Sequence, residues 1–177
     1  MIFAAKRNAD ITVIVHDNGA YSLTTGQYTP LSEKGFKGPS TPRGSLEEPL
    51  NPLTLLLEAG ATFVARGYAG RLNHLTHIMV EAVLHEGFSF IDVLQPCVTY
   101  NNTYKKYNAL VEIFDSIPSS YNEAITAAKK VDKLPIGIIY KVDKPVYHHQ
   151  LQGDWIPVLN HLERKEILER IKRMLKT

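Results

Sequence analysis

The feature that most constrains the fold of this 177-residue chain is the stretch of residues 10–30. It opens with residues 11–16, ITVIVH, which are almost all β-branched and place apolar side chains on both faces of an extended segment. Such a run is typical of a buried strand in a parallel sheet. Asp17, Asn18 and Gly19 follow at once, and turn-forming residues of this kind end a strand. Because ligands of open α/β sheets bind at the carboxyl ends of strands, we expect a binding site at this turn.

Asp17 and Asn18 offer a carboxylate and an amide oxygen, which suit a hard cation and the phosphates that accompany it. The alternative is a turn that caps the strand and binds nothing. Two long loops follow: a polar one that runs to Pro30, and a second one over residues 34–52 that is rich in glycine and proline. Loops of this length without regular structure are usually functional or disordered. Their presence favours a functional site.

The rest of the chain alternates between apolar strand patterns and helical patterns, which is typical of an α/β fold. We expect a mainly parallel sheet flanked by helices, with right-handed crossovers. Residues 1–8 read like the last turns of a helix. Residues 1–142 would form the α/β domain and residues 143–177 a tail with a basic helix over residues 160–175. The expected strands, all parallel in one sheet, are residues 11–16, 61–65, 88–94 and 136–142, and the expected helices are residues 53–59, 72–85, 104–114 and 121–131.

Composition excludes several classes of protein. The formal net charge of +2 is too small to indicate a nucleic-acid partner, which requires a concentrated basic patch. The sequence contains no apolar run of membrane-spanning length and does not open with a secretory signal, so we expect no membrane partner. Cys97 is the one cysteine, which makes an internal disulfide impossible and favours a cytoplasmic protein.

Three stretches together identify a family resemblance: VIVHDNGAYSLTTGQYTP, STPRGSLEEPLNPLTLLLEAGATFVARG and GFSFIDVLQPCVTYN. In order and spacing they resemble the β subunit of the 2-oxoacid:ferredoxin oxidoreductases of the 2-oxoglutarate or pyruvate type, which use thiamine diphosphate. The resemblance extends over most of the chain and implies part of a thiamine diphosphate-binding fold. The sequence given does not contain the family's upstream Gly-Asp-Gly motif or its N-terminal cluster cysteines.

The resemblance assigns roles to the residues of the first loop. Asn18 would be the amide ligand of Mg²⁺ and the Ala20 carbonyl a second ligand, while Asp17 would orient the loop. An apolar side chain at Leu23 would lie beneath the cofactor. Thr24, Thr25 and Gln27 would line the substrate end, although many relatives carry Lys or Gly in place of Thr25. The expected cofactor-binding set is Asp17, Asn18, Ala20, Tyr21, Leu23, Thr24, Thr25 and Gln27.

Cys97 has three interpretations. A lone cysteine is usually a small buried hydrophobic residue. The resemblance makes it instead one thiolate ligand of a [4Fe–4S] cluster, which normally needs four, so this chain alone could not hold the cluster. As a catalytic nucleophile it would need a nearby base, and the candidates His74, His77 and His85 show no diagnostic spacing.

The resemblance implies the oxidative decarboxylation of a 2-oxoacid to an acyl-CoA, with electrons passed through the cluster to ferredoxin. The implied cofactors are thiamine diphosphate, Mg²⁺ and a [4Fe–4S] cluster. The implied partners are an α subunit, with or without a γ subunit, together with ferredoxin, a 2-oxoacid and coenzyme A. We expect the isolated chain to be inactive. The alternatives are a non-catalytic α/β module for assembly or regulation and a small enzyme with Cys97 as nucleophile.

Overall fold

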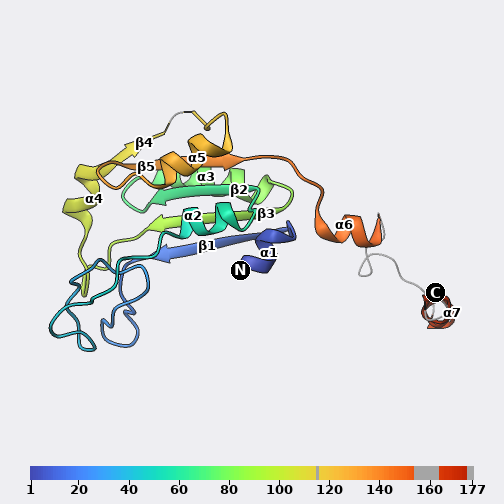
Figure 1. Cartoon of the computed structure of the whole chain (residues 1–177), viewed down its shortest axis with the longest axis horizontal. Helices are drawn as coiled ribbons and strands as arrows, with labels where there is room; N and C mark the ends of the chain where they lie inside the picture. The colour runs from blue at the N-terminus through green and yellow to red at the C-terminus, as the bar shows by residue number, and fades with distance from the viewer. Residues whose placement is uncertain (115, 154–163, 175–177) are drawn as a thin grey trace. The chain divides into compact units, whose positions relative to one another are not determined.

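The structure is a computed structural model that describes residues 1–114, 116–153 and 164–174. The chain divides into two compact units, residues 1–146 and residues 147–177, which are considered separately. The first unit holds the sheet and its helices (Figure 1). An α/β architecture with a mainly parallel sheet confirms the fold class that the alternating sequence pattern predicts.

The sheet of the first unit has five strands in the order β1-β3-β2-β5-β4. The first three neighbours, β1, β3 and β2, are mutually parallel, so their carboxyl ends meet at one edge. In this register Asp17 lies beside Leu94, and Arg66 lies beside Asp92. The strands are β1 (Ile11–Asp17), β2 (Phe63–Tyr68), β3 (Phe88–Leu94), β4 (Val111–Ile113) and β5 (Leu134–Lys141).

The expectation that every strand is parallel is wrong for β5. It runs antiparallel to β2, with an irregularity between Val64 and Ala65, and it is parallel only to β4. The helix expected over residues 104–114 is also too long. It ends at Leu110, and Val111–Ile113 forms β4 instead, because this β-branched segment pairs with the start of β5.

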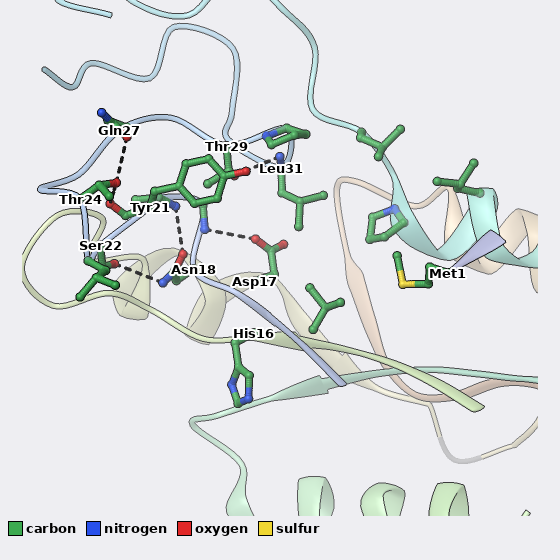
Figure 2. A pocket seen from close by; sticks show the side chains of 18 of the residues that line it. Met1, His16, Asp17, Asn18, Tyr21, Ser22, Thr24, Gln27, Thr29 and Leu31 are labelled. Carbon is green, nitrogen blue, oxygen red and sulfur yellow. Dashed lines mark hydrogen bonds between the residues drawn. The ribbon is translucent and has the colours of Figure 1, made fainter. Parts of the chain in front are cut away.

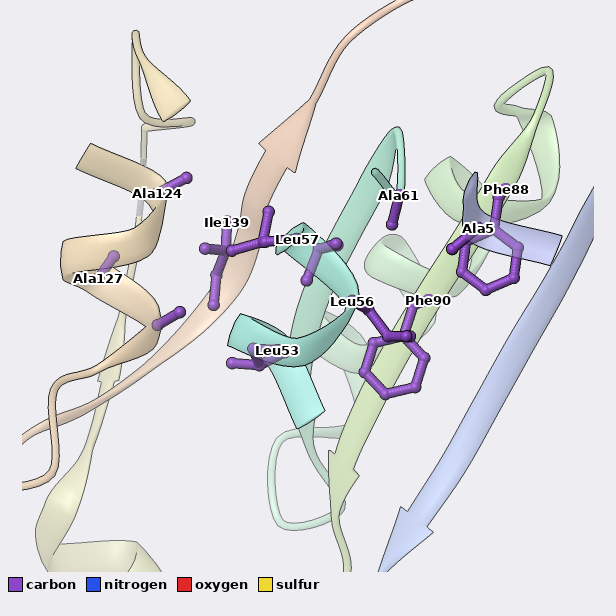
Figure 3. Close-up of a cluster of buried hydrophobic side chains, with 12 residues drawn as sticks. Ala5, Leu53, Leu56, Leu57, Ala61, Phe88, Phe90, Ala124, Ala127 and Ile139 are labelled. Carbon is purple, nitrogen blue, oxygen red and sulfur yellow. The ribbon is translucent and has the colours of Figure 1, made fainter. Parts of the chain in front are cut away.

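Helices cover both faces of the sheet. On one face, α3 (Leu72–Leu84) packs its buried side chains against β2 and β3. On the other face lie α1 (Ile2–Lys6), α2 (Pro52–Glu58) and α5 (Tyr121–Ala128), around the larger core cluster shown in Figure 3. The side chains of this cluster that come from the sheet are Val64, Phe88, Phe90 and Ile139, all completely buried. One further helix of this unit, α4 (Tyr104–Leu110), follows the carboxyl end of β3.

The start of α2 is defined by Asn51, which ties the second loop to the core. Its side-chain oxygen accepts hydrogen bonds from the backbone nitrogens of Leu53 and Thr54, at 3.1 and 3.2 Å, as an N-cap residue does. Its amide nitrogen donates to the Ala128 carbonyl at 2.8 Å. Pro52 occupies the first turn, where no N–H is needed. The second loop therefore has a fixed end next to the site described below.

The first strand is an edge strand, and the prediction that it is buried on both faces is wrong. Val13 and Val15 pack against the larger core cluster, whereas Ile11 and Ile14 are 46% and 38% exposed. The difference arises because β1 has one neighbour, β3, and α3 packs over the centre of the sheet. Apolar side chains predict a strand, but the position of the strand at the edge or the centre of the sheet decides how much of its surface other elements bury.

The second unit contains α6 (Tyr147–Gln152) and α7 (Arg164–Met174). The expected basic helix over residues 160–175 corresponds to α7 in part, and residues 160–163 and 175 lie outside the described residues. Lys165, Lys172 and Arg173 are exposed, and Lys172 pairs with Glu169 at 2.9 Å. A search of the described residues finds no helix with the length and apolarity required to cross a bilayer.

Candidate functional site

The candidate site is built on the loop that follows β1. Two successive side chains fold back onto the backbone: Asp17 Oδ1 accepts from the Gly19 nitrogen at 3.2 Å, and Asn18 Oδ1 accepts from the Ala20 nitrogen at 3.0 Å. Gly19 has a φ of +61°, which an L-residue rarely adopts. These bonds reverse the chain at the carboxyl end of the strand, as the Asp-Asn-Gly sequence predicts.

A second set of hydrogen bonds closes the loop over Tyr21–Gln27, as Figure 2 shows in part. The Tyr21 nitrogen donates to the Gln27 carbonyl at 2.8 Å, and the Gly26 nitrogen donates to the Tyr21 carbonyl at 3.0 Å. The Thr24 hydroxyl donates to Gln27 Oε1 at 2.9 Å. Thr25 has a φ of +71°, which is unusual for a β-branched residue and marks a strained turn. The loop has one defined shape because its own polar groups fix it.

A cavity of about 740 Å³ lies along this loop. Seven of the eight predicted cofactor-binding residues line it; Thr25 does not, and its hydroxyl donates to the Thr24 carbonyl at 2.6 Å. Leu23 is fully exposed at the loop tip. The opposite wall, which sequence reasoning missed, is apolar and includes Leu31, Leu50, Pro52, Leu55 and Leu56. A cavity with polar groups on one wall and an apolar surface opposite suits a cofactor with a charged end and an aromatic body.

Beneath Asp17, a buried ion pair joins β2 to β3. Arg66 Nε and Asp92 Oδ2 are 3.1 Å apart, and the two side chains are only 8% and 1% exposed. Burial raises the pKa of Asp92, and the Arg66 guanidinium opposes that rise. Burial and the nearby Asp92 carboxylate raise the pKa of Asp17 to about 7. The strand-end carboxylate is therefore held in an environment that disfavours its charge.

The same ion pair lines a second cavity of about 380 Å³, together with Asp17 and Tyr107. Burial, with Asp17 as the second cause, raises the pKa of Tyr107 to about 12. Sequence reasoning missed this group. An Arg and an Asp inside the otherwise apolar segments FVARGY and FSFIDVL were the available signal, since unpaired charges are almost never buried in a sheet.

Cys97 lies against the first loop. The Ser22 hydroxyl donates to Cys97 Sγ at 3.2 Å and accepts from the Asn18 side-chain nitrogen, also at 3.2 Å. The hydroxyl hydrogen bond from Ser22, followed by the backbone N–H groups of Tyr100, Thr99 and Asn101, lowers the pKa of the Cys97 thiol. This environment favours a thiolate, which is the form that binds iron.

The turn that carries Cys97 also holds the loop in place. Asn101 Nδ2 donates to the Asn18 carbonyl at 2.9 Å. A Cβ added to Gly19 would lie 2.6 Å from the Asn101 amide nitrogen, and one added to Gly26 would lie 2.5 Å from the Tyr100 ring. Two turns that are far apart in sequence are therefore packed together at the residues predicted to bind different cofactors.

The donor atoms fit the two expected metal groups only in part. Asn18 Oδ1 and the Ala20 carbonyl belong to oxygen-donor types that Mg²⁺ accepts, and Cys97 contributes one thiolate. Among the described residues, no group of three or more His, Cys, Asp or Glu side chains could hold a metal ion. Cys97 is one thiolate, whereas a [4Fe–4S] cluster normally needs four.

Comparisons with known proteins identify the family of the chain. Residues 1–93 match the family model for the C-terminal TPP-binding domain of thiamine pyrophosphate enzymes, and residues 97–154 match the model for the C-terminal part of the pyruvate ferredoxin oxidoreductase β subunit. Since the first match covers more than half of the chain, the chain belongs to the thiamine pyrophosphate enzyme family. Within that family its relatives are β subunits of 2-oxoacid:ferredoxin oxidoreductases, which confirms the resemblance stated from the sequence.

Three relatives illustrate the similarity. The 2-oxoacid:ferredoxin oxidoreductase subunit β of a Sulfolobus species is 37% identical, over 96% of this chain and 61% of its own length. The subunit of the same name from Saccharolobus solfataricus is 40% identical, over 79% of this chain and 51% of its own. A solved structure, the 2-oxoglutarate:ferredoxin oxidoreductase of Magnetococcus marinus with 2-oxoglutarate, coenzyme A and succinyl-CoA bound, superposes with a TM-score of 0.85 at 32% identity. It matches 96% of this chain, which covers 60% of that one.

These relatives are subunits of oxidoreductases, and the chain is accordingly an enzyme subunit. It spans about 61% of the length of the Sulfolobus relative and 51% of the Saccharolobus one.

Proposed function

We propose that this chain is part of the β subunit of a 2-oxoacid:ferredoxin oxidoreductase, which converts a 2-oxoacid and coenzyme A to an acyl-CoA and passes the electrons to ferredoxin. The observation that carries the proposal is the loop Asp17–Gln27, which lies at the carboxyl end of β1 and lines a cavity of about 740 Å³. When bound, thiamine diphosphate supplies the nucleophilic carbon and the electron sink for decarboxylation. The chain's own residues bind and orient it.

The roles of the loop residues follow from their chemistry. Asn18 Oδ1 and the Ala20 carbonyl would bind Mg²⁺, which neutralises the diphosphate. Asp17 holds the turn through the Gly19 nitrogen. Tyr21 and the exposed Leu23 side chain would contact the cofactor, and Thr24 and Gln27 would face the 2-oxoacid, whereas Thr25, which does not line the cavity, would hold the shape of the loop. Cys97 would supply one thiolate to a [4Fe–4S] cluster that accepts the electrons.

Other polypeptide segments would supply the remaining thiolates of the cluster and further oxygen ligands to Mg²⁺. Thiolates other than Cys97 are absent from the sequence, and Mg²⁺ requires near-octahedral oxygen coordination, for which one amide and one carbonyl are not enough. The function therefore depends on partner subunits, of the α type with or without a γ subunit, and on ferredoxin as electron acceptor. The exposed apolar side chains along β1 and the two loops, among them Ile11, Leu23 and Leu46, are consistent with contacts to such segments.

The test is a dye-reduction assay. The purified chain alone, with thiamine diphosphate, Mg²⁺, coenzyme A and a panel of 2-oxoacids, should not reduce a viologen. The complex with the segments and subunits that supply the other ligands should do so, and Cys97→Ser in that complex should abolish the activity. Val98→Ala is the control, because Val98 is the exposed neighbour on the same turn and is 68% exposed. Robust activity of the isolated chain would contradict the proposal.

A second candidate, in which Cys97 is a catalytic nucleophile, is favoured by the lowered pKa of its thiol. Its hydroxyl partner Ser22 is no base, and the ring of His85 hydrogen bonds to Thr62 at 2.9 Å, at the amino end of β3. Cys97 follows the carboxyl end of that strand. A strand of seven residues that rises about 3.3 Å per residue places Cys97 roughly 20 Å from His85. Alkylation of Cys97 in the isolated chain, coupled to a screen for hydrolase and transferase activity, distinguishes this function. An activity that alkylation abolishes would favour it.

A further inference from the structure

The second cavity contains polar groups that the proposed function does not use. Its volume of about 380 Å³ lies within the range of small-molecule sites, about 300–1,000 Å³. Arg66 of β2 and Asp92 of β3 line it, at the side of the sheet where open α/β sheets bind ligands. Asp17 lines both this cavity and the one along the first loop, whereas Arg66 and Asp92 line only the second of these two.

Two atoms of the buried ion pair have no partner. Arg66 Nε and Asp92 Oδ2 lie 3.1 Å apart, and the side chains are 8% and 1% exposed. Arg66 Nη1 and Asp92 Oδ1 are buried as well, but neither has a hydrogen-bond partner among residues 1–114, 116–153 and 164–174. Buried polar atoms are nearly always hydrogen-bonded in native proteins. An unpartnered donor and an unpartnered acceptor on the lining of one cavity therefore indicate a ligand that offers both an acceptor and a donor.

Four other charged side chains of the lining neutralise one another. Lys34 pairs with Glu48 at 2.6 Å, and Lys106 pairs with Glu33. All four are largely exposed, so they lie toward solvent rather than in the sheet. Most of the remaining wall is apolar and consists of Leu31, Leu50, Pro52, Leu94, Leu110, Val131 and Leu134. A ligand in this cavity would thus contact apolar side chains and a few buried charged groups.

We propose that the second cavity binds a free α-amino acid with an apolar side chain. Its carboxylate would accept a hydrogen bond from Arg66 Nη1, and its ammonium group would donate to Asp92 Oδ1 and to the Asp17 carboxyl. Such charge-assisted bonds are stronger than neutral ones. The zwitterion has no net charge, which suits a site where Arg66 and Asp92 already balance each other. The apolar wall would bury the side chain of the amino acid.

Other small ligands match this lining less well. A 2-oxoacid anion has acceptors only, so Asp92 Oδ1 would remain without a donor. An inorganic anion would have the same defect and would also face the carboxyl groups of Asp92 and Asp17. A metal ion would face the positive charge of Arg66. The zwitterion satisfies the donor and the acceptor together.

The experiment is an NMR titration of the isotope-labelled full chain with L-leucine. It needs no cofactor and no partner, because every residue of the lining belongs to this chain, and so it is independent of the proposed function. The Arg66 Nε–H signal and the backbone amide of Asp92 report on the cavity. The comparison ligands are N-acetyl-L-leucine, which lacks the ammonium group, L-leucine amide, which lacks the carboxylate, the 2-oxoacid of leucine, and glycine, which lacks the apolar side chain.

The variant Leu110→Trp fills the cavity, and Ala109→Trp is its matched control. Leu110 lines the cavity, whereas the neighbouring Ala109 is exposed and does not. Both residues belong to α4, which has no fully buried residue, so neither substitution should unfold the chain. Arg66 and Asp92 themselves are left unchanged, because the fold depends on their ion pair.

L-leucine should shift the Arg66 and Asp92 signals in a saturable, one-site manner. Each comparison ligand should bind at least tenfold more weakly, as should L-leucine to Leu110→Trp, while Ala109→Trp should match the wild type. Absence of saturable binding up to about 10 mM would overturn the inference and assign the two unpartnered atoms to water. Equal affinity for L-leucine and any comparison ligand, or wild-type affinity in Leu110→Trp, would also overturn it. If Leu110→Trp unfolds, the comparison ligands decide.

Discussion

Replacement of Asp92 by Asn should destabilise the first unit strongly, because it leaves the buried Arg66 guanidinium without a counter-ion. The two groups are 3.1 Å apart and almost completely buried, at 8% and 1% exposure. At an effective dielectric constant of about 20, Coulomb's law gives an attraction of about 5 kcal/mol at this distance. Breaking a buried pair by removing one partner typically costs about 3–5 kcal/mol, so we expect a loss in that range for Asp92→Asn.

The assay is urea-induced unfolding of the isolated chain followed by circular dichroism, which gives the free energy of unfolding by linear extrapolation. Glu112→Gln is the matched control, since Glu112 and Lys133 are also 3.1 Å apart but are 50% and 65% exposed. An exposed pair contributes about 0–1 kcal/mol. The double variant Arg66→Met/Asp92→Leu should recover most of the lost stability, because apolar residues can replace a buried ion pair. A loss below about 1 kcal/mol for Asp92→Asn, or a double variant as unstable as the single one, would refute the reasoning.

Three further predictions follow from local geometry. Burial lowers the pKa of His85, so this side chain binds a proton less readily in the folded chain than in the unfolded chain. The free energy of unfolding should therefore fall as the pH drops below about 6.5, and His85→Gln should reduce this dependence. Gly26→Ala should weaken cofactor binding more than Gly35→Ala does, as measured by calorimetry on the complex. Both glycines have a positive φ, but a Cβ would meet a neighbour only at Gly26, where it would lie 2.5 Å from the Tyr100 ring. Asn51→Ala should lower the free energy of unfolding by about 1–2 kcal/mol, because it removes the N-cap of α2 and the hydrogen bond from the Asn51 side chain to the Ala128 carbonyl. The control Asn73→Ala should change it very little, because Asn73 is exposed.

Local patterns in the sequence predict some elements accurately and others not. The strand Phe88–Leu94 agrees with its expected bounds, because a largely apolar segment follows Gly87, whose φ of +126° ends the connection from α3. The direction of β5 and the change from helix to strand at Val111 depend on pairing with distant segments, which no local pattern records. The exposure of Ile11 and Ile14 likewise depends on the position of β1 at the sheet edge.

The same distinction applies to the candidate site. The loop residues from Asp17 to Gln27 are contiguous in sequence, so the family resemblance of one stretch implied them together, and seven of the eight line one cavity. The parts that the sequence did not predict come from distant segments. The ion pair between Arg66 and Asp92 arises from the register of two strands, and the contact of Ser22 with Cys97 spans 75 residues.

We propose above that the loop after β1 binds the cation and diphosphate of thiamine diphosphate through Asn18. The most direct test is calorimetric titration of the assembled oxidoreductase with thiamine diphosphate in the presence of Mg²⁺, for the wild type, Asn18→Ala and the surface control Asn73→Ala. We expect Asn73→Ala to bind as the wild type does. Asn18→Ala should weaken binding at least tenfold, or about 1.4 kcal/mol, because the bound cation would lose a directly coordinating oxygen. Unchanged affinity in Asn18→Ala would contradict the account.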